Sequence, residues 1–261
     1  MLQDTLTQQQ WQDFQEQGYV HLGTAAAEET AALQQRIDDI MMGTADIDYD
    51  KVAMQLDRAD GPDSKPGPQS RGHKGAHLDY RKIQDLEIDP LFLAYLQKPL
   101  YRDICSHAYG AAADVACFRA MFMNKPSGLG SYLVWHQDRW TNLERDPQVT
   151  VWTALDPATK ENGCVQVIPG SHHKLLNPDH GSGFLSDEMV EEVSQRQDSV
   201  YLELEAGDVV LLHNWLLHTS DVNRTDQSRR AFSVCYMDAA TVTNNDATYP
   251  VVFGEGALSP A

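Results

Sequence analysis

The chain has 261 residues, of which 42% are hydrophobic and 22% are charged, so it holds enough apolar residues for a sizeable core. Its formal net charge of −18 argues against partners such as bare nucleic acid or an anionic membrane, because both require clustered Lys and Arg. No apolar run approaches the ~20 residues of a membrane span, the N-terminus lacks a signal peptide, and the four scattered cysteines suit buried free thiols, so we expect a cytoplasmic protein.

The first part of the chain carries helix signals. Thr7 and Gln10 have the spacing of a capping box, and Gly18 is placed to end this first helix. Residues 24–42 form a second predicted helix with apolar side chains at helical spacing, and residues 89–110 resume that spacing. Between them, residues 57–76 are rich in Gly, Pro, Asp and Ser, which predicts a long loop that serves as a linker or an active-site lid.

After Ala116 the pattern changes to short strand-like runs separated by turn signals. These runs cover residues 116–123, 131–138, 148–156, 163–171, 199–213 and 229–238. The polar stretch 174–198 is expected to be an insertion between strands. Helices followed by many short strands predict a mostly β fold, an antiparallel barrel or jelly roll with helices on one side.

Two His-X-Asp motifs compete as half of a metal site. His136 and Asp138 lie in a strand-like run, and residues i and i+2 of a strand face the same way, so both side chains can reach one ion. His77 and Asp79 follow the Gly/Pro loop and precede a predicted helix, with no strand to align them. The first motif is therefore favoured.

A metal site needs at least one more ligand, which His213 or His218 offers after a long apolar strand. Two histidines and one carboxylate on one face of an ion form the facial triad of non-haem Fe(II) oxygenases. Arg229 and Arg230 follow, and an arginine there suits bidentate binding of a cosubstrate carboxylate. Adjacent residues of a strand face opposite ways, so only one of the two arginines reaches the ion's side.

The chain resembles the phytanoyl-CoA dioxygenase family of Fe(II)- and 2-oxoglutarate-dependent oxygenases over roughly residues 5–240. The resemblance is carried, in this order, by FMNKPSG, WHQD, VWTALD, NGCVQVIPGSHH, GDVVLLHNWLLHTS and HTSDVNRTDQSRRA. It implies one domain over residues 1–261, with a helical part at about 1–110 and a double-stranded β-helix (cupin-like) barrel at about 115–240. It also implies that O2 is the oxidant and that Asp138, a carboxylate absent from related halogenases, favours hydroxylation.

The resemblance also implies roles for individual residues. Iron would be held by His136, Asp138 and His218. The cosubstrate 2-oxoglutarate would be bound by residues that match family positions, namely Arg229, Ser220, Trp152, Met121 and Lys82. Residues near the metal motifs are candidate substrate contacts, namely Asn124, Lys125, Arg139 and His77.

The substrate is expected to be a small polar metabolite, because the chain lacks an evident basic surface for CoA. An anionic substrate would need the nearby cations Arg119, Lys125, Arg139 and Arg145, whereas a quaternary ammonium would need an aromatic box from Tyr132, Trp135, Trp140 and Trp215. Acyl-CoA or natural-product hydroxylation is the alternative within the family. A metal hydrolase and a non-catalytic metal- or ligand-binding barrel are alternatives of other classes, and desaturation, ring closure and the oligomeric state are left open.

Overall fold

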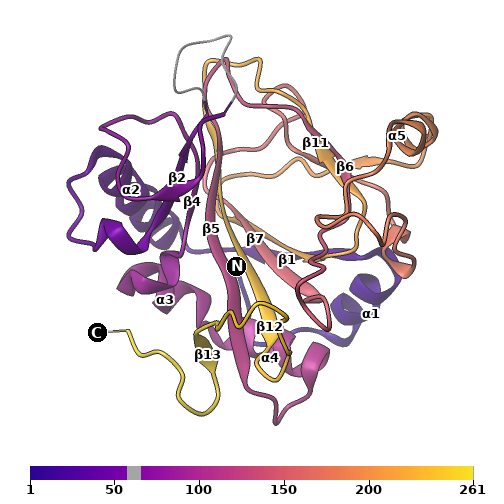
Figure 1. Ribbon diagram of the computed structural model, residues 1–261, viewed down its shortest axis with the longest axis horizontal. Helices are drawn as coiled ribbons and strands as arrows, with labels where there is room; N and C mark the ends of the chain where they lie inside the picture. The colour runs from indigo at the N-terminus through magenta and orange to yellow at the C-terminus, as the bar shows by residue number, and fades with distance from the viewer. Residues whose placement is uncertain (58–65, 261) are drawn as a thin grey trace.

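Two antiparallel sheets face each other across the centre of the molecule (Figure 1). The computed structural model describes residues 1–57 and 66–260. Within them the larger sheet has nine strands, in the order β1 (Tyr19–Thr24), β10 (Asp208–His213), β7 (Val149–Ala154), β12 (Arg229–Asp238), β5 (Val115–Lys125), β4 (Tyr80–Gln84), β2 (Ala53–Leu56) and β3 (Ser70–Arg71), with β13 (Val251–Phe253) beside β5. The smaller sheet has the order β6 (Leu133–His136), β11 (His218–Ser220), β8 (Val165–Val167) and β9 (Val200–Tyr201). The predicted double-stranded β-helix is confirmed.

The first four α-helices cover the larger sheet, and the fifth packs against β6 of the smaller sheet. The α-helices are α1 (Gln8–Gln17), α2 (Ala27–Met42), α3 (Pro90–Leu96), α4 (Pro99–Tyr109) and α5 (Asp187–Ser194), and the 3₁₀ helices are η1 (Tyr49–Lys51), η2 (Leu86–Ile88) and η3 (Ser171–His173). Buried side chains of α2 and α3 share one core cluster with β5, β7 and β12. Figure 1 shows α2 and α3 on the side of β5 that faces away from β6 and β11.

Alternation along β5 and β12 separates this core from the space between the sheets. Phe122 of β5 and Phe232 of β12 are paired across the two strands and belong to the core under the helices. Met121 and Ser233 are also paired across the strands, and both face the cavity between the sheets. Successive side chains of a strand point to opposite faces, so one pair of strands builds both the core and the cavity wall.

The predicted helix signals are confirmed at the N-terminus. The hydroxyl of Thr7 accepts a hydrogen bond from the amide of Gln10 at 3.1 Å, and the Gln10 side chain accepts one from the amide of Thr7 at 3.0 Å. Gly18 ends α1 with φ at 79°, a left-handed conformation that glycine adopts without a steric penalty. The third predicted helix is divided into α3 and α4, because Pro99 has no amide to continue the first of them.

The helical part expected over about 1–110 omitted the strands β1 to β4. These strands extend the larger sheet at both edges, and each spans at most six residues, too few for a clear alternation. The stretch 57–76 is therefore not wholly a loop, since β3 lies within it. The lid interpretation also falls on residues 58–65, which lie outside the described residues.

The apolar run 199–213 does not continue to His218 as one strand. The chain turns after β10, so that His213 ends a strand of the larger sheet and His218 begins a strand of the smaller sheet. His213 and His218 therefore belong to different sheets. None of the helices that the structure describes is long and apolar enough to cross a membrane.

Phe232→Ala is expected to lower the free energy of unfolding by about 3–5 kcal/mol, because the truncated ring leaves a cavity in the core. The ring is fully buried, and its centroid lies 4.7 Å from that of Phe92. Urea denaturation measures the change. Val242→Ala is the control, because Val242 is 63% exposed and its truncation should change stability by less than about 0.5 kcal/mol. Equal stabilities for the two variants would contradict the assigned core.

Candidate functional site

Two histidines meet across neighbouring strands of the smaller sheet. His136 at the end of β6 is the register partner of His218 at the start of β11, and the two ring centroids are 4.0 Å apart. Directly opposed residues on one face of an antiparallel pair bring their side chains together. The sheet thus holds both imidazoles beside the cavity.

The hydrogen bonds of these rings leave one nitrogen of each free for a ligand. The Nδ1 atom of His136 lies 2.8 Å from the carbonyl of Val134, and that of His218 lies 2.8 Å from the carbonyl of Leu216. A carbonyl only accepts, so Nδ1 carries the proton in both rings and Nε2 presents a lone pair. Burial, with His218 nearby, lowers the pKa of His136 to about 3, so this imidazole is neutral at physiological pH.

Asp138 reaches the same point from outside the strand. β6 ends at His136, so the expectation that both members of the motif lie in one strand is wrong. The backbone amide of Asp138 donates to the carbonyl of Asn214 at 2.7 Å, which fixes the chain after the strand. Its carboxylate Oδ1 then lies 3.8 Å from Nε2 of His136. The side chains converge although the alternation argument does not apply.

These three side chains fit a divalent metal such as Fe(II). One ligand atom from each of His136, Asp138 and His218 lies within 4.8 Å of the others. Two imidazoles and one carboxylate match the donor set that non-haem iron prefers. Burial opposes ionisation of Asp138, but the guanidinium of Arg119 beside it outweighs this effect and keeps the pKa of the carboxyl below its usual range. The carboxylate is therefore charged and ready to bind a cation.

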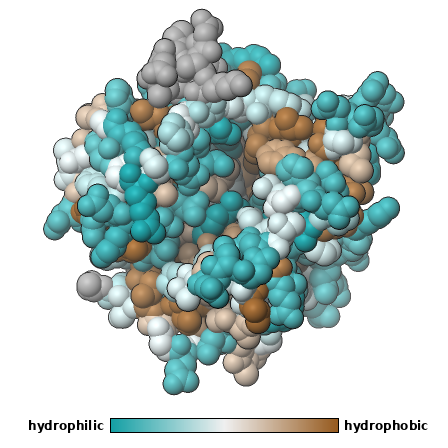
Figure 2. All heavy atoms as spheres, in the orientation of Figure 1, coloured by the Kyte–Doolittle hydropathy of each residue, from teal (hydrophilic) through white to brown (hydrophobic). Residues whose placement is uncertain are grey.

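A cavity of about 230 Å³ lies between the two sheets and includes the three side chains. Figure 2 shows this face of the molecule hollowed near its middle. The other side chains that line the cavity are Lys82, Arg119, Met121, Met123, Leu133, Arg139, Trp140, Thr150, Trp152, Val165, Ser182, Phe184, Leu212, Thr219, Ser220, Arg229 and Ser233. The structure thus gathers the metal cluster and all five predicted cosubstrate residues around one space.

Arg229 is a buried cation, and two of its guanidinium nitrogens find no hydrogen-bond partner among the described residues. It is only 3% exposed, and its Nε and Nη1 atoms find no acceptor within the described parts of the chain. Its guanidinium lies 5.7 Å from the ring centroid of Trp152, and burial lowers its pKa to about 10. Unpaired donors in a buried charged group are costly, so this arginine suits an anionic ligand that enters the cavity.

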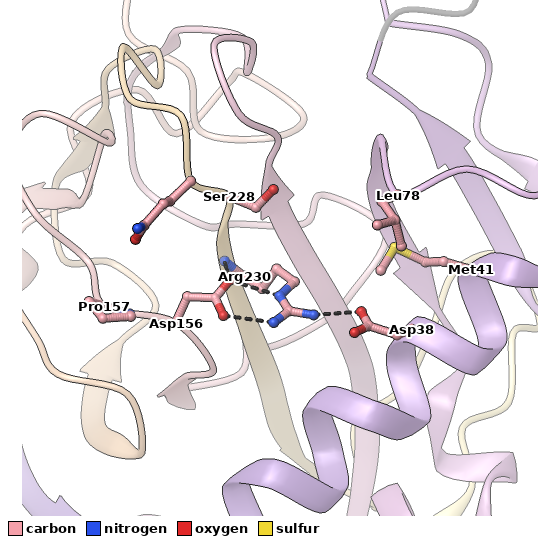
Figure 3. A pocket seen from close by; sticks show the side chains of 8 residues that line it. Asp38, Met41, Leu78, Asp156, Pro157, Ser228 and Arg230 are labelled. Carbon is pink, nitrogen blue, oxygen red and sulfur yellow. Dashed lines mark hydrogen bonds and ion pairs between the residues drawn. The ribbon is translucent and has the colours of Figure 1, made fainter.

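Arg230 points away from the cavity, as the alternation predicts. Its Nε and Nη2 atoms donate to the two carboxylate oxygens of Asp156 at 2.8 Å, and its Nη1 atom donates to Asp38 of α2 at 2.5 Å (Figure 3). It lines a second cavity of about 370 Å³ on the outer side of β12. This second cavity has no histidine in its lining, and both of its carboxylates are engaged by Arg230.

The predicted substrate contacts do not all lie at the cavity. Arg139 lines it, with Nε 3.7 Å from the carboxylate of Asp146. Lys125 is buried in a small adjoining pocket that Arg229 and Ser220 also line, and its Nζ atom donates to the carbonyl of Ser131 at 2.8 Å. Asn124 donates to the carbonyls of Leu78 and Tyr80, which joins β5 to the start of β4. His77 is exposed and lines neither space.

Sequence reasoning missed the contribution of the insertion 174–198. Phe184 from this segment stacks on His136 with ring centroids 4.7 Å apart and also lines the cavity. Gly183 has φ at 68°, and a Cβ there would overlap the carbonyl oxygen of Gln137, so the segment approaches the metal motif as only glycine allows. A lone aromatic residue after a glycine within a polar stretch is the available signal.

Comparison with known proteins places the chain in a family. The sequence profile described as phytanoyl-CoA dioxygenase matches residues 14–231. The chain belongs to the phytanoyl-CoA dioxygenase family. It is 30% identical over 166 residues to a probable phytanoyl-CoA dioxygenase of Caenorhabditis elegans, covering 59% of this chain and 53% of that protein. It is 27% identical over 264 residues to phytanoyl-CoA dioxygenase 1 of Oryza sativa, covering 90% of each. Against the first curated relatives the match spans only about half of their length, 53% in each case.

Solved structures share the fold. EctD from S. alaskensis, crystallised with 2-oxoglutarate and 5-hydroxyectoine, is similar with a TM-score of 0.73 and 22% identity over 94% of this chain and 80% of that one. The carbocyclase SnoK from nogalamycin biosynthesis, described as dependent on α-ketoglutarate, has a TM-score of 0.66 and 20% identity over 96% of this chain and 95% of that one. At these identities the likeness establishes the fold of the family.

His136→Ala and His218→Ala are each expected to abolish tight binding of Fe(II) or Mn(II) without unfolding the chain, because each removes one imidazole nitrogen from a set of three candidate ligands. Calorimetric titration of metal into the metal-free protein measures the loss, and circular dichroism checks the fold. His77→Ala and Asp79→Ala form the matched control and should leave metal binding intact. Loss of metal binding in the control pair would move the site to the other His-X-Asp.

Lys125 is expected to make the stability depend on pH. Burial, with Arg229 nearby, lowers the pKa of Lys125 to about 7 from its ordinary 10.5. Between these values the unfolded chain holds a proton that the folded chain has lost, so this group makes stability rise with pH from about 7 to 10.5. Lys125→Met should remove that rise, as measured by urea denaturation at pH 7, 8.5 and about 10. An unchanged slope, matching that of the exposed control Lys51→Met, would contradict it.

Proposed function

We propose that this protein is an Fe(II)- and 2-oxoglutarate-dependent dioxygenase that hydroxylates an unactivated C–H bond of a small polar metabolite. The observation that carries the proposal is the joint lining of one cavity by the cluster His136, Asp138 and His218 and by the partly unpartnered guanidinium of Arg229. The first provides the metal ligands and the second a binding group for a carboxylate.

Each residue has a distinct task in this proposal. His136, Asp138 and His218 hold the iron, and Arg229 binds the carboxylate of 2-oxoglutarate that lies away from it, with Ser220 donating to the same carboxylate. Lys82 adds a cation on the adjoining strand β4, and Met121 and Trp152 pack against the cosubstrate. All five cosubstrate residues line the cavity, on strands β4, β5, β7, β11 and β12. Rigid strands hold such groups more accurately than loops do.

When bound, iron with 2-oxoglutarate supplies the oxidising power, since O2 is consumed as the cosubstrate is decarboxylated to succinate and CO2. The chain itself binds and orients the metal, the cosubstrate and the substrate, and it excludes water from the cavity. Phe184 stacks against His136, so the insertion narrows the opening above the metal cluster. The retained carboxylate of Asp138 occupies the position that distinguishes hydroxylases from halogenases of the family, so we propose hydroxylation.

The size of the cavity supports a small substrate. About 230 Å³ lies below the range of roughly 300–1,000 Å³ typical for ligand pockets, and it must hold the cosubstrate as well as the reacting part of the substrate. An acyl-CoA or a large natural product would have to lie mostly outside it. We therefore propose a small polar metabolite as the substrate instead of an acyl-CoA.

Two alternative functions use the same metal cluster. A metal hydrolase would need the three metal ligands but would have no use for a buried, unpaired Arg229. A non-catalytic barrel would bind a metal or ligand without consuming oxygen. Anaerobic addition of Fe(II) and then 2-oxoglutarate discriminates between them, since only an oxygenase should develop the visible charge-transfer band. Mass spectrometry of a metabolite panel with Fe(II), 2-oxoglutarate and O2 then seeks the addition of one oxygen atom matched to succinate.

Arg229→Lys is expected to weaken 2-oxoglutarate binding by about 30-fold to several thousand-fold, because lysine cannot reproduce the planar fork and leaves a desolvated carboxylate poorly paired. Titration of 2-oxoglutarate against succinate formation measures the change, and metal titration should show that Fe(II) still binds. Arg230→Lys is the matched control, since Arg230 faces α2 and contacts Asp38 and Asp156. A larger effect on 2-oxoglutarate binding from Arg230→Lys would show that the other arginine binds the cosubstrate.

A further inference from the structure

We infer that the substrate carries an anionic group, a carboxylate, phosphate or phosphonate, which Arg119 and Arg139 bind at the end of the cavity opposite Arg229. This inference rests on the proposed function, since it concerns the substrate of that site. Arg119 is paired with Cys235 across β5 and β12, whereas Arg229 is paired with Lys125. Six residues of strand separate these pairs by roughly 20 Å, so the two arginines serve different ligands.

Both arginines have donors that nothing yet satisfies. The Nε atoms of Arg119 and Arg139 are buried and find no hydrogen-bond acceptor among the residues that the structure describes. Both side chains line the cavity that holds the metal cluster. A buried N–H without a partner costs free energy, and an anion entering the cavity would provide the acceptor.

The carboxylates near Arg119 and Arg139 interact with other groups. An Nη2 atom of Arg119 lies 3.6 Å from Oδ2 of Asp138, but Asp138 is also a proposed metal ligand. Asp146 lies 3.7 Å from Arg139, and its two oxygens accept from the amide of Trp140 at 2.7 Å and from Nε1 of Trp215 at 3.0 Å. Neither carboxylate is within hydrogen-bond distance of the arginine that faces it.

The charge of the loaded cavity favours an anion. Four cations line it, Lys82, Arg119, Arg139 and Arg229, and among the described residues Asp138 is the sole carboxylate in its lining. Burial lowers the pKa of Lys82 to about 8, which leaves it mostly protonated at neutral pH. The two positive charges of Fe(II) and the two negative charges of 2-oxoglutarate cancel. Counting Asp146 with Asp138 against the four cations leaves two positive charges for the substrate.

The aromatic box that a quaternary ammonium substrate would need is not formed. The guanidinium of Arg119 lies 4.8 Å from the ring centroid of Trp140, so the face of this ring already contacts a cation of the protein. Trp135 packs among Ile168, Leu185 and Leu217 instead of lining the cavity, and Trp215 donates to Asp146. Tyr132 is exposed. A cationic substrate would therefore meet Arg119 without the box that the sequence predicts from Tyr132, Trp135, Trp140 and Trp215.

The test compares acids with their uncharged amides on the intact protein, loaded with Mn(II) and the unreactive cosubstrate analogue N-oxalylglycine. The probes are 3-phenylpropionate, hexanoate and N-acetylglycine, each with its primary amide, together with phenylphosphonate. Ligand-observed NMR and calorimetry measure the dissociation constants. At least one acid is expected to bind with a dissociation constant of about 1–10 mM, and its amide at least about tenfold more weakly.

Variants then locate the effect. Arg119→Met and Arg139→Met should each remove the preference for acid over amide. Arg145→Met is the matched control, because Arg145 is exposed and pairs with Asp238, and it should keep the preference. Titration of Mn(II) into Arg119→Met separates loss of the acid site from loss of metal binding at Asp138.

Several results would overturn the inference. These are equal binding of acids and amides, a preference that survives in both Arg119→Met and Arg139→Met, an equal loss in Arg145→Met, or no binding of any acid up to about 50 mM. The charge-transfer band with Fe(II) and 2-oxoglutarate reports separately on the proposed function. If the band forms and acids are not preferred, only the inference fails. If the band does not form, the proposed function fails, and the same acid and amide comparison on metal-free protein still decides whether Arg119 and Arg139 bind an anion.

Discussion

The site depends on the pairing of His136 with His218 across β6 and β11. Because this register places both rings on one face, their Nε2 atoms can meet at one ion, and a slip of one residue would turn a ring to the other face. The backbone then positions the third candidate ligand, since the bond from the Asp138 amide to the carbonyl of Asn214 holds the chain where the carboxylate faces the rings. The arrangement of the three candidate ligands is thus set by the pairing of β6 with β11 and by the main-chain bond from Asp138 to Asn214, before any metal binds.

The larger sheet provides the cations that an anionic cosubstrate needs in a chain whose net charge is −18. Salt screens the repulsion of distant carboxylates beyond about 8 Å, so the local groups decide. The inner faces of β4, β5 and β12 present Lys82, Arg119 and Arg229, while the outer faces carry the apolar core under the helices. Desolvation makes the unpaired donors of Arg119 and Arg229 unfavourable, and an anionic ligand relieves that cost. The same alternation keeps Arg230 outside, where Asp38 and Asp156 neutralise it.

The parts of this arrangement that could be predicted from the sequence are those with a local physical cause. The capping box at Thr7, the helical periodicity and the alternation that directs Arg229 inward all depend on neighbours in the chain. The strands β1 to β4 were missed because they are short and gain their stability from the sheet edges that they join. Asp138 lies outside its expected strand, and Phe184 reaches His136 from a distant insertion, because both positions are determined by tertiary contacts. Likewise, only the folded chain shows that the guanidinium of Arg119 lies over the ring of Trp140.

Gln137, the residue between the two ligands of the motif, connects the insertion to the metal cluster. Its side chain is fully buried and donates to the carbonyls of Lys174 at 2.8 Å and Trp215 at 2.7 Å, while its Oε1 accepts from the amide of Leu176 at 2.7 Å. Its backbone amide donates to the carbonyl of Gly183 at 3.1 Å. The insertion 174–198, which places Phe184 over His136, is therefore hydrogen-bonded to Gln137, the residue between His136 and Asp138. Because a buried polar group must keep its partners, the position of the covering segment and the geometry of the metal ligands are physically linked.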